Sequence, residues 1–170
     1  MRLVAAAREA LADAGHDVAF DVIARRAGVG NATLYRHFPT RADLLVAVYA
    51  DEVAALCQRG ADLLEADEPA DALFAWLDDF VLHVATKRPL ALAATEGVDR
   101  TTLFGQWHAS ITSTADRLVR RARPALRAGL TTADVLTLAS GAALAADPGK
   151  ARHLVALLRT GFADPGNGGG

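Results

Sequence analysis

The chain has 170 residues, of which 52% are hydrophobic and 22% charged, and its formal net charge is −2. Its apolar runs are too short, and too often interrupted by charges, for a membrane-spanning helix, which needs about 20 apolar residues. The single cysteine, Cys57, excludes an internal disulfide and agrees with the reducing conditions of a cytoplasm.

Much of the hydrophobic content is alanine, the residue with the highest helix propensity, and no strand-like alternation bounded by turns occurs. The sequence therefore predicts an all-α fold of about nine helices. We expect a three-helix N-terminal domain over residues 1–45 and a larger helical domain over residues 46–164. The glycine-rich residues 165–170 are expected to be a disordered tail.

In the N-terminal part, helices are expected at about 2–14, 20–27, 31–37 and 41–66. Proline disfavours a helical conformation in the residue before it, so Phe38-Pro39 is expected to end the third helix. Thr40 is placed to cap the fourth helix, with Asp43 close to the positive end of its dipole.

Residues 23–38, with the sequence IARRAGVGNATLYRHF, have the pattern of two short helices joined by a tight turn. Ala24 is small enough for a close helix crossing, and Gly28 can adopt the left-handed conformation that ends a helix. The predicted core of this helix-turn-helix consists of Ile23, Ala24, Gly28, Val29 and Leu34. The same positions are also compatible with an ordinary helical hairpin.

The helix expected over residues 31–37 has one inward apolar residue, Leu34, and is otherwise mostly small or polar, unlike a helix that is made to be buried. Small residues at its start would let it enter a DNA major groove, where polar groups can donate to phosphates. The predicted DNA contacts are Asn31, Ala32, Thr33, Tyr35, Arg36, His37, Thr40 and Arg41. The expected base readers are Asn31, Ala32 and Arg36, with contact to the DNA backbone alone as the alternative for Arg36. The expected phosphate contacts include Thr33, Tyr35, His37 and Arg41.

The charge distribution is a weaker indication of the same partner. Residues 1–50 carry a net charge of +1, and residues 51–170 carry a net charge of −3. Placement is more informative than the totals, because Arg36, His37 and Arg41 lie together at the motif.

The N-terminal motif also carries a family resemblance. Residues 3–50, and above all the block TLYRHFPTRADLL over residues 33–45, resemble the TetR-type bacterial transcriptional regulators. Ala19 and Gly30 depart from the family, which usually has serine or threonine before the second helix and often serine before the third. The resemblance implies a cytoplasmic homodimer that binds a palindromic operator on double-stranded DNA, represses transcription and is released by a small organic effector.

In the C-terminal part, helices are expected at about 70–86, 107–128, 132–146 and 149–162, with one short helix between residues 89 and 104. The helix over residues 70–86 has the clearest amphipathic pattern, and Lys87-Arg88-Pro89 is expected to end it. Thr131 or Thr132 is expected to cap the helix over residues 132–146. Pro124 is expected to kink the helix over residues 107–128.

Several aromatic residues fall on the helices that enclose a ligand cavity in the family. Aromatic side chains with a few polar groups suit a small organic molecule. The implied pocket residues are Cys57, Trp76, Phe80, His83, Phe104, Trp107, His108 and Ile111. The alternative is that these aromatic residues fill a core.

The last two expected helices offer a surface for pairing, since one carries small residues that permit close approach and the other carries large leucines. In the family, two such helices from each protomer form a four-helix interface. The implied interface residues are Leu136, Ala139, Ser140, Ala143, Leu154, Leu157, Leu158 and Phe162. The alternative is that they pack against the core of their own chain.

No catalytic constellation is recognisable. The five histidines lack compact metal-ligand spacing, and the chain has no defensible acid–base pair and no internal phosphate-binding glycine loop. We therefore predict no enzymatic activity, no metal site and no cofactor. The main alternative is a helical small-molecule carrier or enzyme with a vestigial helix-turn-helix, and another is a transcriptional activator.

Overall fold

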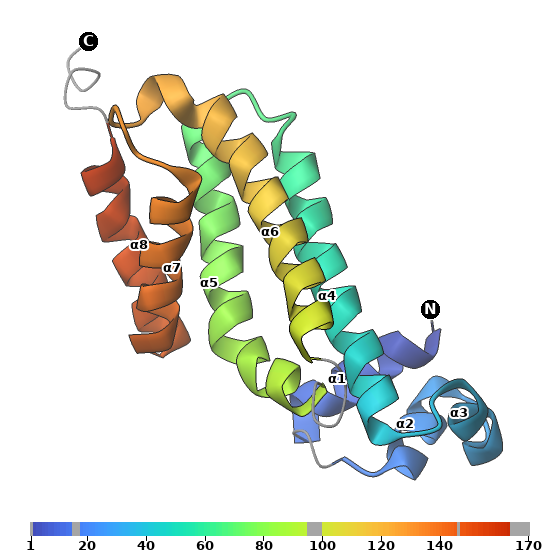
Figure 1. The fold of residues 1–170 in the computed structure, drawn as a ribbon. Helices are drawn as coiled ribbons and strands as arrows, with labels where there is room; N and C mark the ends of the chain where they lie inside the picture. Colours follow the sequence, from blue (N-terminus) through green and yellow to red (C-terminus); the bar gives the residue numbers. More distant parts are fainter. Residues whose placement is uncertain (1, 15–17, 95–99, 146, 164–170) are drawn as a thin grey trace. The chain divides into compact units, whose positions relative to one another are not determined.

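The structure is a computed structural model that describes residues 2–14, 18–94, 100–145 and 147–163 (Figure 1). Its α-helices are α1 (Arg2–Ala14), α2 (Phe20–Ala27), α3 (Asn31–His37), α4 (Arg41–Leu63), α5 (Pro69–Ala94), α6 (Arg100–Ala122), α7 (Thr132–Ala145) and α8 (Pro148–Phe162). A 3-10 helix, η1 (Arg123–Ala125), follows α6. Apart from one isolated bridge between Leu126 and Ala163, the described residues form no β-structure, so the all-α prediction is confirmed.

The chain divides into two compact units. One comprises residues 1–52 and 89–104, and the other comprises residues 53–88 and 105–170. Because α4, α5 and α6 each contribute residues to both units, the chain passes between the units within helices. The domain boundaries expected from the sequence stay predictions, and the expected tail over residues 165–170 lies outside the described residues.

In the first unit, α1 packs on α2, and α2 packs on α3. The bounds predicted for these three helices are confirmed. Alanine makes close packing possible here, because Ala7 and Ala24 are buried and leave room for the larger Ile23 and Leu34, which are also fully buried. The first half of α4 adds Val48 to the buried set.

Three helices begin with side-chain caps that the sequence encodes locally. The Thr40 hydroxyl accepts from the Asp43 amide at 3.1 Å, and the Asp43 carboxylate accepts from the Thr40 amide at 2.9 Å. Thr131 and Asp134 form the same reciprocal pair at the start of α7. Asp147 caps α8, where its carboxylate accepts two backbone amides. These bonds satisfy donors that otherwise lack partners in the first helical turn.

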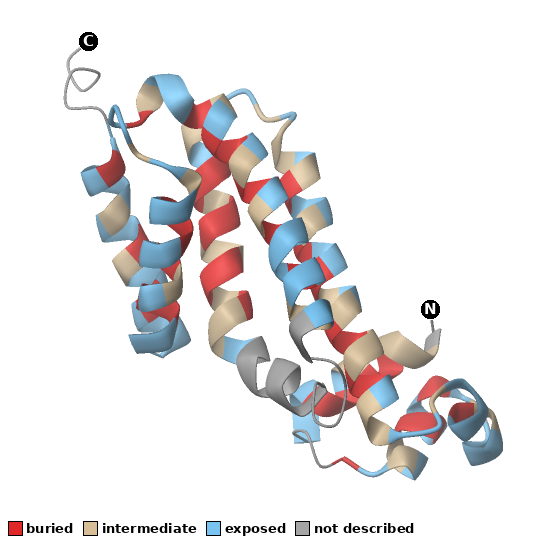
Figure 2. Ribbon diagram, viewed as in Figure 1, coloured by how far each residue is buried: buried red, intermediate tan, exposed pale blue. Residues whose placement is uncertain are grey.

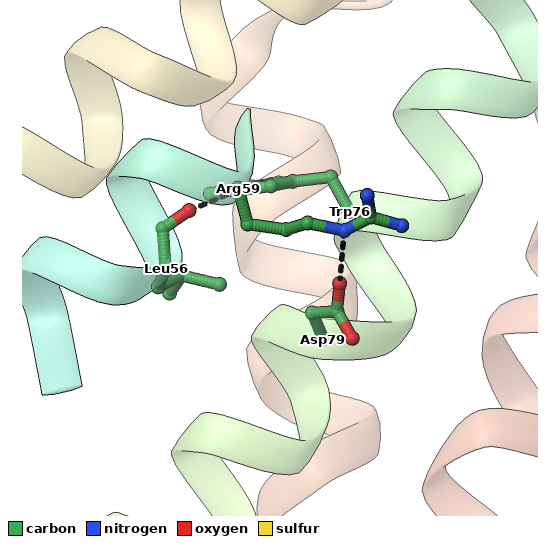
Figure 3. A network of polar contacts seen from close by, with 4 residues as sticks. All are labelled: Leu56, Arg59, Trp76 and Asp79. Atoms are coloured by element: carbon green, nitrogen blue, oxygen red, sulfur yellow. Dashed lines mark hydrogen bonds and ion pairs between the residues drawn. The ribbon is translucent and has the colours of Figure 1, made fainter. Parts of the chain in front are cut away.

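In the second unit, α4, α5 and α6 meet around a fully buried tryptophan. The indole nitrogen of Trp76 donates to the Leu56 carbonyl oxygen at 3.0 Å, and beside it Arg59 pairs with Asp79 at 3.3 Å (Figure 3). A Cβ atom on Gly60 would lie 2.2 Å from Thr114 Cγ2 and 2.9 Å from the indole nitrogen. Only glycine therefore permits this close approach of the helices.

The C-terminal end of α8 is attached to α5. Arg159 forms an ion pair with Asp71, and its guanidinium lies 5.4 Å from the centre of the Phe74 ring. The Phe74 and Phe162 ring centroids are 6.1 Å apart, and both side chains are buried. The end of α8 is consequently part of the core of this unit.

Two expectations about prolines were wrong. α5 does not end at Lys87-Arg88-Pro89 but continues to Ala94. The described residues nevertheless form eight α-helices and the 3-10 helix η1, in line with the expected number of about nine. A proline inside a helix removes one amide donor, yet the leucines and alanines after Pro89 have high helix propensity and favour continuation. Pro124 does not kink a longer helix, because α6 ends at Ala122 and Pro124 lies in η1.

Candidate nucleic-acid interface

The turn between α2 and α3 is a glycine-terminated helix end. Gly28 has φ 69° and ψ 33°, the left-handed conformation that a side chain disfavours. Its amide donates to the Arg25 carbonyl oxygen at 3.1 Å, and the Val29 amide donates to the Ala24 carbonyl oxygen at 3.0 Å. These two bonds form a Schellman motif, which satisfies the last carbonyls of α2 before the chain turns into α3.

α3 has seven residues and one buried side chain, Leu34. Its exposed side chains are those of Asn31, Ala32, Tyr35, Arg36 and His37, and Thr33 is half-buried. Figure 2 shows this short helix largely in the colour of exposed residues. The small and polar side of α3 is therefore accessible within its unit.

α3 begins without a side-chain cap. Gly30 occupies the N-cap position with φ −75° and ψ 152°, and no atom lies within 4 Å of where its Cβ would be. Ala19 likewise precedes α2 without a side-chain hydrogen bond. The two sequence departures therefore leave both helices of the motif uncapped by side chains.

Tyr35 is the largest exposed side chain of α3, with 52% of its surface accessible. Its ring lies against Phe20, the first residue of α2, with 5.0 Å between centroids and a 41° angle between ring planes. Phe20 is half-buried. Sequence reasoning missed this contact, because the two residues are separated by the whole turn and no local pattern connects them.

Two of the predicted DNA contacts are already engaged within the unit. The Thr40 hydroxyl donates a hydrogen bond to the Asp43 carboxylate at 2.8 Å, and it also accepts one from the Asp43 backbone amide. One guanidinium nitrogen of Arg41 donates to the Val18 carbonyl oxygen at 2.9 Å, and the other terminal nitrogen is buried without a hydrogen bond. These residues hold the start of α4 and the chain before α2, and their predicted contacts with phosphates stay predictions.

The remaining charges leave the exposed side of α3 positive. Arg25 pairs with Asp21 at 3.3 Å, and Arg26 pairs with Asp13 at 2.8 Å. Within the described part of the chain, Arg36 forms no ion pair. Unpaired, exposed cationic groups are those that attract phosphate groups.

The residues predicted to line a ligand pocket do not all share one environment. In the second unit, Trp76, Phe80, His83, Trp107 and Ile111 are buried, Cys57 is half-buried and His108 is exposed. Phe104 is half-buried and belongs to the other unit. Trp76 and Phe80 stack with 5.5 Å between ring centroids, as core residues do. His108 is the exposed member of the set in this unit, and its role in a pocket stays a prediction.

The residues predicted for a dimer interface also divide into two sets. Leu136, Ala139, Ala143 and Phe162 are buried within their own chain, whereas Ser140, Leu154 and Leu158 are half-buried and Leu157 is 57% exposed. The buried set follows the alternative reading, packing against its own core, and presents almost no surface to another chain.

Two exposed leucines on α7 were not predicted. Leu138 is 45% and Leu144 is 55% exposed, and α7 packs on α8, which carries Leu157. The two leucines are six residues apart, so they lie about 120° apart around the helix, and no three- or four-residue repeat marks them as one exposed face. Which apolar residues of α7 are buried therefore depended on the tertiary structure.

Other kinds of site find no support in the described ranges. They contain no group of three or more histidine, cysteine, aspartate or glutamate side chains arranged to hold a metal ion. No helix among them is both long enough and apolar enough to span a membrane.

Two family models match the chain. Residues 3–48 match the bacterial regulatory proteins of the tetR family, and residues 68–164 match the C-terminal domain of SbtR-like transcriptional regulators. No curated protein matches the chain.

Three solved structures illustrate the likeness. The TetR transcriptional regulator SCO0520 from Streptomyces coelicolor is 32% identical, with a TM-score of 0.81 over 96% of this chain and 98% of its own. A TetR regulatory protein from Mycobacterium vanbaalenii is 31% identical, with a TM-score of 0.77 over 96% and 93%. SmeT, the repressor of the Stenotrophomonas maltophilia efflux pump SmeDEF, shares only the fold, at 18% identity and a TM-score of 0.64 over 97% and 90%.

These matches agree with the geometry of α2 and α3 and with the accessible polar side of α3. They identify a DNA-binding regulator rather than an enzyme. The chain belongs to the TetR family of bacterial transcriptional regulators.

Proposed function

We propose that the protein is a cytoplasmic, homodimeric repressor that binds a palindromic operator and is released by a small organic effector. The exposure of the small and polar side of α3 carries this proposal. A helix of this composition lies in water in the free protein and is available to a DNA major groove. The assigned base readers are Asn31, Ala32 and Arg36, and the assigned phosphate contacts are Thr33, Tyr35 and His37.

Arg41 and Thr40 have a different role in this proposal. Their hydrogen bonds to Val18 and Asp43 hold the ends of the elements that support α3. We therefore assign them to the orientation of the helix-turn-helix rather than to direct phosphate binding. This assignment revises the role that the sequence indicated for them.

Dimerisation is supported by the exposed leucines of α7 and α8. Leu138, Leu144 and Leu157 are large apolar side chains in contact with water in the single chain. Their burial against a second copy would remove apolar surface from water, at about 25 cal/mol per Å². A two-fold pair would place two copies of α3 at successive major grooves, about 34 Å apart, and so accounts for a palindromic operator.

The proposed effector binds among the apolar side chains of the second unit. Phe80, Trp107 and Ile111 would supply apolar contact, and His83 would supply a polar group. Trp76 is left out of this set, because it is completely buried, whereas the other four side chains keep a small exposed fraction. Since α4 is one continuous helix that contributes to both units, a shift of α4 could change the spacing of the two α3 helices. Such couplings are typically about 1–3 kcal/mol.

The decisive experiment is the enrichment of a duplex from a random-sequence library by the full chain, followed by titration at several salt concentrations. The proposal expects enrichment of an inverted repeat. It also expects the logarithm of the affinity to fall linearly with the logarithm of salt concentration, because phosphate contacts release counterions.

The same titration tests the alternative of a carrier or enzyme with a vestigial motif. Failure to enrich any duplex, together with no salt-dependent binding of a mixed-sequence duplex at low salt, would support that alternative. Transcription from a template that contains the enriched sequence then separates a repressor from an activator, since only a repressor lowers the transcript yield.

A further inference from the structure

We propose that Phe20 is a positioning residue for DNA binding, which holds the Tyr35 ring in the orientation that presents its hydroxyl to a phosphate. This inference depends on the proposed function, because it concerns the same interface. It adds a residue from α2 that lies outside the set assigned to DNA. Phe20 acts through Tyr35 and need not touch the duplex.

The contact itself is the first observation. The Phe20 and Tyr35 rings are 5.0 Å apart between centroids and tilted by 41°, within the range in which aromatic pairs attract each other. Phe20 is half-buried, and as the first residue of α2 its backbone is fixed by the helix that packs on α1. Tyr35 therefore leans on a supported side chain from a neighbouring helix.

The exposure of Tyr35 makes that support necessary. With 52% of its surface accessible, the side chain has few other contacts to select one rotamer. Because χ1 near +60° would clash with the preceding helical turn, an exposed aromatic side chain on α3 has two staggered χ1 positions, and only one places the hydroxyl at a given phosphate. Selection of one position in advance is worth about twofold in affinity per half-site, or roughly fourfold for a dimer on two half-sites.

A purely structural role for Phe20 makes a different prediction. If Phe20 only stabilised α2, its replacement would lower DNA affinity by the same factor whatever side chain occupies position 35. If Phe20 positions the Tyr35 hydroxyl, its replacement has an effect only while that hydroxyl is present. A double-mutant cycle separates these two cases.

The experiment compares wild type, Phe20→Leu, Tyr35→Phe and the double variant, all as full chains. Leucine keeps an apolar side chain of moderate size at position 20 but removes the ring. The probe is the duplex that wild type enriches from the random-sequence library, and thermal unfolding confirms that each variant is folded. Should Phe20→Leu fail to fold, Phe20→Met removes the ring with a more adaptable side chain.

We expect Phe20→Leu to weaken binding by about fourfold in the Tyr35 background and by less than about 1.5-fold in the Tyr35→Phe background. Equal losses in both backgrounds, or no loss in either, would overturn the positioning role while the protein still binds DNA. Absence of binding by wild type to any duplex would instead refute the proposed function. The two failures are thus distinguishable in one set of titrations.

Discussion

The exposed side of α3 and the exposed leucines of α7 and α8 are both open to solvent in the single chain, but their chemistry differs. α3 presents Asn31, Arg36 and His37, which water solvates well, whereas α7 and α8 present Leu144 and Leu157, which it does not. The polar side of α3 is stable in water and can remain free until a charged partner binds. The exposed leucines of α7 and α8 are stabilised when another copy of the chain covers them. Both surfaces are exposed, but their different polarity predicts different partners.

The helix starts show a second difference. α7 and α8 begin with side-chain caps from Thr131, Asp134 and Asp147, whereas α3 begins at Gly30 without one. The helices of the proposed pairing surface are therefore fixed by local hydrogen bonds. The recognition helix depends more on the burial of Leu34 and on the turn at Gly28.

The largest effect is expected from charging the apolar surface. The double substitution Leu144→Asp and Leu157→Asp should yield monomers, because two carboxylates per chain cannot be buried without partners. Operator affinity should fall by about 10²- to 10⁴-fold, since the two half-sites are no longer bound as one ligand. Sedimentation and gel-shift titration measure the two outcomes. Ala55→Asp adds a charge at an exposed site on α4 and serves as the control. If the double variant remains a dimer, the interface does not include these two leucines.

A smaller loss is expected when the polar surface is truncated at Tyr35. Tyr35→Ala should weaken operator binding by about 30-fold, because each half-site loses one hydrogen bond worth about 1 kcal/mol. The dimer should persist, and the melting temperature should fall only slightly, since the half-exposed side chain loses little besides its contact with Phe20. Gel-shift titration beside sedimentation tests this, and unchanged affinity would count against the phosphate contact.

Arg36→Ala should act on sequence selectivity more than on general affinity. If Arg36 reads a base, its loss should cost about tenfold on the enriched duplex and relax the preference at one position of each half-site. A repeat of the library enrichment with the variant shows whether that position changes. An equal loss on all duplexes would assign Arg36 to phosphate.

Gly30→Ser should stabilise the uncapped recognition helix. The backbone at Gly30 is extended with negative φ and has open space at Cβ, so serine fits and can cap α3. The expected gain is about 0.5–1 kcal/mol in the free energy of unfolding, from the cap and from the more restricted unfolded chain. Gly30→Ala isolates the second contribution in denaturant titrations, and equal stability of the two variants would show that no cap forms.

The smallest effect concerns the cap of α7 and its dependence on pH. The Thr131 hydroxyl and then the Thr131 amide lower the pKa of Asp134 below its ordinary value of 3.8. The charged carboxylate therefore stabilises the fold above that value, and the stabilisation is lost as the pH falls through the lowered pKa. Asp134→Asn should reduce the melting temperature slightly at neutral pH, with a difference that shrinks in acid. If the difference in melting temperature is instead the same at every pH, the cap stabilises the fold independently of the charge on Asp134.

Much of the N-terminal unit could be predicted from the sequence, because its signals are local. Gly28 ends α2, Phe38-Pro39 ends α3, and Thr40 with Asp43 starts α4, each through contacts within a few residues. The buried side of α3 followed from one apolar residue among polar ones. The family resemblance extended this prediction to DNA binding.

The C-terminal unit was harder to predict, because its helices have more than one apolar side. On α7, both the alanines and the leucines could face a core, and the sequence favoured the small residues for pairing. The structure buries Ala139 and Ala143 and leaves Leu138 and Leu144 exposed. Whether a given face is buried depends on side chains from distant parts of the chain. The spacing of apolar residues along one helix carries no information about them.

The sequence by itself determined where the first helices begin and end, where the tight turn lies, and that α3 has a polar side. Those properties arise from backbone conformation and hydrogen bonds between near neighbours. Only the tertiary structure decided that Arg41 bonds to Val18, that Phe20 supports Tyr35, and that Leu157 is exposed while Phe162 is buried. Each of these depends on which residues, although distant in the sequence, are brought into contact when the helices pack.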